Sequence, residues 1–172
     1  MLKIDVGTRD LQQCADAVMR LRAEFLYGLK QYNNIHFNFL SDSKPRYYND
    51  YVKGDFSYIK FRKYMNYIFS YANTSSLKNE LHKINSAEEI QIGDVFIQKG
   101  KPYGHAVTVM DIAKNQMGEI LFLLSQSYMP AQDIHILNNP KNLTISPWYK
   151  VKKTGNLNTP EWTFTFDDLM RF

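Results

Sequence analysis

Two residues far apart in the chain carry the side chains of a thiol nucleophile and its base. Cys14 is the only cysteine, and His105 follows Gly104 at the start of the apolar run 105–110. A thiol can attack a carbonyl carbon, while an imidazole accepts the thiol proton and later protonates the leaving group. Cys14 lies near the start of a predicted helix, whose positive N-terminal end stabilises a thiolate. Together these residues predict a cysteine hydrolase.

Each of the two residues also has a purely structural interpretation. A stripe of apolar residues at helical spacing contains Cys14, Val18, Leu21 and Phe25. A free cysteine on such a stripe is commonly a buried packing residue. A helix that began at Thr8 would leave Cys14 deeper in the helix, where the dipole acts less strongly. His105 could be a partly exposed histidine at a strand end.

A third side chain is needed to orient the imidazole. With a hairpin turn centred near residues 116–117, position 107 faces position 126, so Gln126 shares a strand face with His105. The amide oxygen of Gln126 can accept the imidazole N–H. A register slip of one residue would present Ser125 or Ser127 instead. Gln126 could also be an ordinary polar strand end.

Weaker candidates for substrate binding are Gln13, His36, Asn38, Tyr103, Tyr128 and Trp148. The glutamine, or its neighbour Gln12, could donate to an oxyanion or cap the helix. The histidine and asparagine share one face of a predicted strand, and the aromatic residues could form a wall; packing is the alternative role. Asp16 is expected in solvent or in an ion pair. No residues have the spacing of metal ligands, so neither a metal nor a cofactor is expected.

The elements that must position these side chains follow from periodicity and turn residues. Asp10, with Gln13 three residues later, predicts a helix start, and apolar spacing extends that helix to about Leu29. Further helices are predicted over 58–71 and 77–84. Strands are predicted over 2–6, 35–40, 94–98, 105–112, 120–127, 134–137 and 147–151, with a turn at 114–119. Residues 41–56 are predicted to form a loop, and the tail 162–172 to pack back on the sheet.

Composition indicates one folded domain. The chain has 172 residues, of which 44% are hydrophobic, and a net charge of +4. It has no run of Lys and Arg typical of a nucleic-acid-binding arm, so no nucleic-acid partner is expected. A single cysteine excludes an internal disulfide. No apolar stretch approaches the roughly 20 residues of a membrane span. The N-terminus lacks a signal-peptide run, which leaves a cytoplasmic protein or a form without its export signal as alternatives.

The hairpin resembles the core of NlpC-type and CHAP-type hydrolases of the papain-like superfamily. The resemblance covers residues 93–97, 104–107 and a following strand that ends at Gln126, together with Gln13 and Cys14 at a helix start. It implies that Cys14 is the nucleophile, His105 the base and Gln126 the residue that orients the base. Two departures leave the substrate class open: Ala-Asp follows Cys14 where Ser-Gly or an aromatic pair is common, and a long insertion spans 25–92.

Nearly the whole chain is similar to a bacterial family described as a domain of unknown function (4846). The matching phrases lie at 12–24, 36–39, 127–135, 146–149 and 159–162. The family has no established activity to transfer. Its members carry further sequence upstream, often with an export signal, which leaves open whether this chain is the C-terminal part of a longer protein that works in the cell envelope.

We therefore expect a single α+β domain over residues 1–172, with a papain-like (NlpC-like or CHAP-like) helix packed on an antiparallel β-sheet. The expected activity is hydrolysis of an amide or related acyl bond, with a peptide, peptidoglycan fragment or other acyl compound as substrate. Acyl transfer by the same Cys–His pair is one alternative. Another is a non-catalytic module that binds a glycan, peptide or lipid head group on the same fold.

Overall fold

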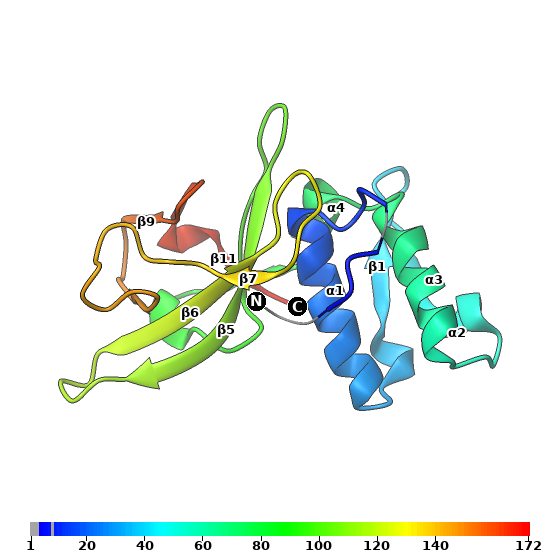
Figure 1. Ribbon diagram of the computed structural model, residues 1–172, viewed down its shortest axis with the longest axis horizontal. Helices are drawn as coiled ribbons and strands as arrows, with labels where there is room; N and C mark the ends of the chain where they lie inside the picture. The colour runs from blue at the N-terminus through cyan, green and yellow to red at the C-terminus, as the bar shows by residue number, and fades with distance from the viewer. Residues whose placement is uncertain (1–3, 8) are drawn as a thin grey trace.

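Helices precede most of the strands along the chain in the computed structural model, which describes residues 4–7 and 9–172 (Figure 1). The four α-helices are α1 (Cys14–Gly28), α2 (Tyr48–Val52), α3 (Tyr58–Phe69) and α4 (Thr74–Glu80). Short 3-10 helices are η1 (Tyr32–Asn34), η2 (Ala87–Glu89) and η3 (Phe166–Asp168). No helix in the described ranges is both long and apolar enough to cross a membrane.

The main sheet has the strand order β3-β11-β4-β5-β6-β7, with β8 also paired to β6, and its pairs are antiparallel. Its strands are β3 (His82–Lys83), β4 (Val95–Gln98), β5 (His105–Lys114), β6 (Ile120–Gln126), β7 (His135–Ile136), β8 (Tyr149–Lys150) and β11 (Leu169–Arg171). Two small antiparallel pairs join β1 (His36–Asn38) to β2 (Pro45–Tyr47) and β9 (Asn156–Asn158) to β10 (Thr163–Thr165). The chain therefore has the predicted α+β fold.

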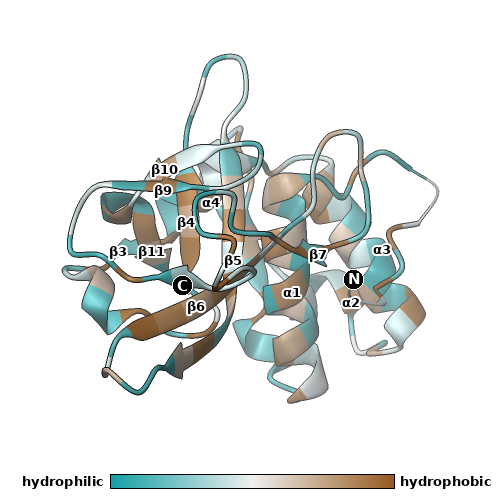
Figure 2. Ribbon diagram, turned by 60° about the vertical axis from the view of Figure 1, so that its left-hand side comes forward, coloured by the Kyte–Doolittle hydropathy of each residue, from teal (hydrophilic) through white to brown (hydrophobic). Residues whose placement is uncertain are grey.

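Alternating side chains of β4 and β5 contribute to two separate apolar cores. Ile97 and Ala106 face the helices and pack in one core with residues of α1, α3 and α4. Phe96 and Val107 point to the other side and pack with the aromatic residues of the C-terminal region. Figure 2 shows the resulting hydrophobic colouring of the central strands and of α1. A strand that is buried on both faces reads as a continuous apolar run, as 105–109 does.

Helix α1 starts later than the sequence pattern predicts. The N-cap is Gln13, not Asp10, and the carboxylate of Asp16 accepts the backbone N–H of Gln13 at 3.2 Å. Asp10 instead accepts the backbone N–H of Ala131 at 2.6 Å. The Asp16 side chain, three residues after Gln13, thereby provides an acceptor for an N–H group that has no acceptor within the helix. The shift makes Cys14 the first helical residue.

Several other predicted boundaries were wrong. Residues 4–6 form no strand, and the rest of the predicted strand 2–6 lies outside the described residues. The predicted loop 41–56 contains β2 and α2, and the helix predicted over 77–84 runs instead over α4, because the side chain of Asn73 accepts the N–H groups of Ser75 and Ser76. The other predicted strands of the main sheet are present, some of them shorter.

Candidate active site

The Cys14 thiol lies against the backbone at the start of β5. Its Sγ donates to the carbonyl oxygen of Gly104 at 3.8 Å, and the backbone of Ala106 also contacts the sulfur. Gly104 has no room for a side chain, because a Cβ there would lie 2.3 Å from the Gln98 carbonyl oxygen and 2.9 Å from Thr74 Cγ2. The thiol thus lies beside the backbone of Gly104 and Ala106, the two residues that flank His105 in the sequence.

A pocket of about 300 Å³ opens at the thiol. Its walls come from the first turn of α1, the first turn of α4 and the loop between β4 and β5. Residues at its edge include Gln13, Cys14, Asn73, Thr74, Tyr103 and Met129. The backbone N–H groups of a first helical turn have no acceptor within the helix, so the start of α1 offers donors next to the sulfur. This pocket is where a carbonyl group could meet the thiol.

Burial determines the protonation of the groups at the start of α1. It raises the pKa of the Cys14 thiol, although contacts with backbone Ala15 and with the side chain of Thr74 act in the opposite direction. The expected stabilisation of a thiolate by the helix end is therefore outweighed by desolvation. Asp16 was predicted in solvent or in an ion pair, but it is only 9% exposed and has no ion pair with another described residue. Burial raises its pKa to about 7. The thiol is neutral at rest near neutral pH.

The His105 imidazole is fixed by a chain of two further side chains. Its Nε2 lies 2.9 Å from Gln126 Oε1, the contact predicted from strand alternation. The amide nitrogen of Gln126 in turn donates to Glu161 Oε2 at 2.8 Å. Because Glu161 accepts a hydrogen bond from the Gln126 amide N–H, the amide oxygen faces the imidazole and accepts a hydrogen bond from Nε2–H. In a neutral ring Nδ1 then carries the free lone pair.

Aromatic rings surround the imidazole. Tyr128, Trp162 and Phe164 have ring centroids 5.3, 5.4 and 5.8 Å from that of His105. Burial lowers the pKa of His105, while the Gln126 hydrogen bond and the charge of Glu161 partly oppose this. The imidazole is therefore neutral near pH 7, which is the state of a base.

Cys14 and His105 meet at the same strand end but on different sides of it. Ala106 packs in the core of α1, whereas the His105 ring packs with Phe164 of the second core. In the described part of the chain no hydrogen bond joins the thiol to the imidazole. Among the described residues His105 Nδ1 has no hydrogen-bond partner, and the residue as a whole is 2% exposed.

Only some of the residues predicted to bind substrate lie near Cys14 or His105. Gln13 and Tyr103 line the pocket, and Tyr128 contacts His105. Three others are not among the described residues that line it: His36, Asn38 and Trp148. The ring of His36 lies 4.9 Å from that of Tyr47 at an angle of 51°, and the tryptophan beside the His105 imidazole is Trp162.

The alternatives to Gln126 have other roles. Ser125 Oγ is buried and has no hydrogen-bond partner among the described residues. Ser127 Oγ lies 3.0 Å from the backbone carbonyl of Gln12, two residues before the nucleophile candidate. This contact joins the end of β6 to the start of α1.

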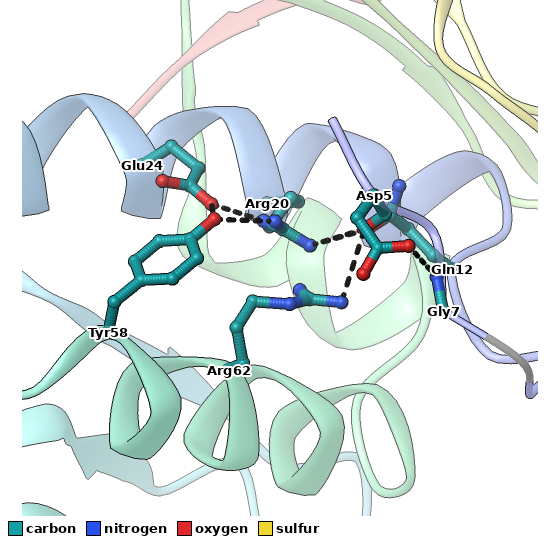
Figure 3. Close-up of polar contacts among 7 residues, drawn as sticks. All are labelled: Asp5, Gly7, Gln12, Arg20, Glu24, Tyr58 and Arg62. Carbon is teal, nitrogen blue, oxygen red and sulfur yellow. Dashed lines mark hydrogen bonds and ion pairs between the residues drawn. The ribbon is translucent and has the colours of Figure 1, made fainter. Parts of the chain in front are cut away.

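A buried arginine of α1 connects this helix to neighbouring segments (Figure 3). Arg20 is 1% exposed and pairs with Glu24 at 2.7 Å. It also donates to Gln12 Oε1 at 3.0 Å and to the Tyr58 hydroxyl at 3.1 Å. The backbone carbonyl of Asp5 accepts from it as well, at 3.3 Å. One guanidinium therefore links the N-terminal segment, α1 and α3.

Comparison with known proteins gives one match. A family model described as a domain of unknown function (4846) matches residues 1–171. No curated protein and no solved structure matches the chain.

Proposed function

The chain belongs to the family described as a domain of unknown function (4846), and we propose that it is a papain-like cysteine hydrolase that cleaves an amide or related acyl bond. The observation that carries the proposal is the oriented imidazole. The Glu161–Gln126–His105 chain leaves Nδ1 as the basic nitrogen of the imidazole. His105 is also next in sequence to Gly104, whose carbonyl oxygen the Cys14 thiol contacts, and the nearness of a neutral imidazole to a free thiol supports the proposal.

The reaction follows from the two neutral groups. No hydrogen bond joins the thiol and the imidazole in the described structure, so in the proposed cycle the Cys14 or His105 side chain first turns to bring Sγ to Nδ1. Nδ1 then accepts the thiol proton while the sulfur attacks the substrate carbonyl carbon, and the Cys14 N–H contributes to binding of the oxyanion. When the tetrahedral intermediate collapses, the carbon–nitrogen bond breaks and the imidazolium protonates the leaving amine. Water then attacks the thioester, giving up a proton to His105, and the acid leaves with the thiol restored.

Gln126 and Glu161 stabilise the imidazolium formed in this cycle. The Gln126 oxygen keeps its hydrogen bond to Nε2, and the Glu161 carboxylate raises the pKa of His105. Tyr128 and Trp162 cover the ring and limit the water around it. Peptide in the cell wall is the proposed substrate by analogy of fold.

Product analysis tests the proposal. Peptidoglycan fragments and a panel of peptide amides would be incubated with the native protein, Cys14→Ser and His105→Ala, and analysed by mass spectrometry. We expect an acid and an amine from at least one compound, with loss of products in both variants and full retention in the distant Trp148→Phe control. Products that persist in Cys14→Ser would contradict the assignment of the nucleophile.

A binding module on the same fold is the second candidate, and the buried thiol favours it. Cys14 is 6% exposed with a raised pKa, as expected for a packing residue. Under this alternative, Cys14→Ala would bind the same fragments as the native protein and neither would change them. Isothermal titration calorimetry of both proteins, with product analysis of the same samples, separates the two functions.

A further inference from the structure

A second pocket, of about 210 Å³, shares no lining residue with the Cys14 pocket. It lies between the loop after β7, the strands β8 and β9, and η3. Its polar lining residues are Asn139, Lys141, Asn142, Lys150, Lys152, Asn156 and Asn158. Buried Tyr149 and Phe166 contribute apolar surface.

The charged residues that line this pocket are all positively charged. Three lysines line it, and no described lining residue is an aspartate or a glutamate. Lys150 pairs with Glu119 outside the lining. In the described part of the chain Lys141 and Lys152 have no ion-pair partner. Two uncompensated cations thus remain at one concave surface, where low-dielectric walls concentrate their field.

The asparagines that line the pocket, like the lysines, can offer it hydrogen-bond donors. The side-chain oxygen of Asn142 accepts the backbone N–H of Thr144 at 3.2 Å, and that of Asn158 accepts the Thr163 hydroxyl at 3.3 Å. Each oxygen thus has one partner within the protein, whereas the structure shows no contact from the NH₂ groups of Asn142 and Asn158 to another described residue, so both NH₂ donors are free for a ligand. Asn139 is buried and uses both its oxygen and its nitrogen to hold the loop.

We propose that this pocket binds an oxyanion, a phosphate or carboxylate group, carried by a small polar molecule. Ammonium and amide donors match the acceptor oxygens of such a group, and charge-assisted hydrogen bonds are about twice as strong as neutral ones. A volume of about 210 Å³ exceeds that of a single ion. The surplus space and the buried aromatic edges suit the polar carbon skeleton that carries the anion. This binding is independent of the proposed hydrolysis.

Titrations followed by ¹H–¹⁵N NMR at constant ionic strength test the proposal. The probes are inorganic phosphate, acetate, glucose 6-phosphate and, as the uncharged match, glucose. We expect saturating shifts confined to residues 139–158 and 166, with glucose 6-phosphate binding at least tenfold more tightly than glucose. Stronger binding of phosphate or of acetate identifies which oxyanion the pocket prefers.

Matched charge variants give the decisive comparison. Lys141→Gln combined with Lys152→Gln removes the two unpaired cations, whereas Lys83→Gln combined with Lys114→Gln removes two exposed lysines that have no ion pair in the described part of the chain and lie outside the pocket lining. We expect the Lys141/Lys152 variant to lose at least fivefold in affinity and the Lys83/Lys114 variant less than twofold. Equal losses, shifts that do not saturate, or equal binding of glucose and its phosphate would overturn the proposal.

Discussion

His105 is held by side chains from two other parts of the chain, and their polarity determines which ring nitrogen carries the proton. Gln126 could be predicted from the sequence, because strand alternation places it on the face of His105. Glu161 could not be predicted, since it lies in the connection between β9 and β10, whose position depends on tertiary packing. The burial that raises the pKa of Cys14 is what the packing interpretation of its apolar stripe predicts, and it outweighs the expected effect of the helix end.

Glu161 sets the orientation of the Gln126 amide, so its removal should change the tautomer of His105. Glu161→Ala frees the amide to turn, whereas Glu161→Gln keeps an acceptor for its N–H. ¹⁵N NMR of the imidazole should show the Nε2–H form in the native protein and in Glu161→Gln, and a mixture in Glu161→Ala. We expect hydrolysis to fall about tenfold in Glu161→Ala, equivalent to about 1.4 kcal/mol. An unchanged tautomer in that variant would refute this role.

Gly104, whose carbonyl oxygen the Cys14 thiol contacts, has no room for a side chain. In Gly104→Ala the new Cβ would lie 2.3 Å from the Gln98 carbonyl oxygen and 2.9 Å from Thr74 Cγ2. Because backbone must move to relieve this overlap, we expect a loss of about 1–3 kcal/mol in the free energy of unfolding, measured in urea. Gly28→Ala is the control, since nothing lies within 4 Å of its added Cβ. Equal stability of Gly104→Ala and native protein would show that the space is not restricted.

At the scale of elements, the central hairpin of β5 and β6 was predictable and the region before α3 was not. The apolar run of β5, the turn at 114–119 and the run of β6 are local signals of a hairpin. The segment 41–56 is polar and rich in tyrosine, so it reads as a loop. It forms β2 and α2 because Tyr48 and Val52 are buried against α3 and α1, a tertiary effect that local sequence does not contain.

The start of α1 should make stability depend on pH. Burial raises the pKa of Asp16 to about 7, above its unfolded value, so the folded protein holds a proton that the unfolded chain releases. Stability is then full below about pH 4 and falls as pH rises to about 7, by at most about 4 kcal/mol. Glu80, whose pKa burial also raises to about 7, adds a dependence of the same sign.

Asp16→Asn isolates this effect, because the asparagine oxygen can still accept the Gln13 N–H. Urea unfolding between pH 4 and 8 should show a smaller decline with pH than in the native protein, and greater stability at pH 8. The exposed Asp133→Asn serves as the control. A decline as steep as that of the native protein would mean that Asp16 is ionised throughout.

At the scale of the whole molecule, two cores share β4 and β5, and buried polar links hold α1 between the helices and the sheet. Side-chain alternation explains the two cores. The burial of Arg20 could not be predicted from the sequence, because an arginine on a helix usually lies in solvent. Its burial depends on acceptors from residues 5, 12, 24 and 58, which only the complete fold brings together.

Arg20→Met should weaken the whole assembly. It leaves Gln12 Oε1 and the Asp5 carbonyl without this donor and Glu24 without its ion pair. We expect a loss of about 3–5 kcal/mol in unfolding free energy and faster hydrogen exchange at the start of α1. Lys63→Met, on the exposed face of α3, is the control. Native-like stability of Arg20→Met would show that the links are not needed.

The most direct test of the hydrolase account is the pH dependence of Cys14 acylation by 4-nitrophenyl acetate, followed by intact-protein mass between pH 5 and 10. Burial lowers the pKa of His105, so the account predicts that the rate increases with pH only up to about pH 6.5 and is constant above that pH. His105→Ala should react about 10²–10⁴ times more slowly. A native rate that increases tenfold per pH unit to beyond pH 9, unchanged in His105→Ala, would identify an unassisted thiol and contradict the account.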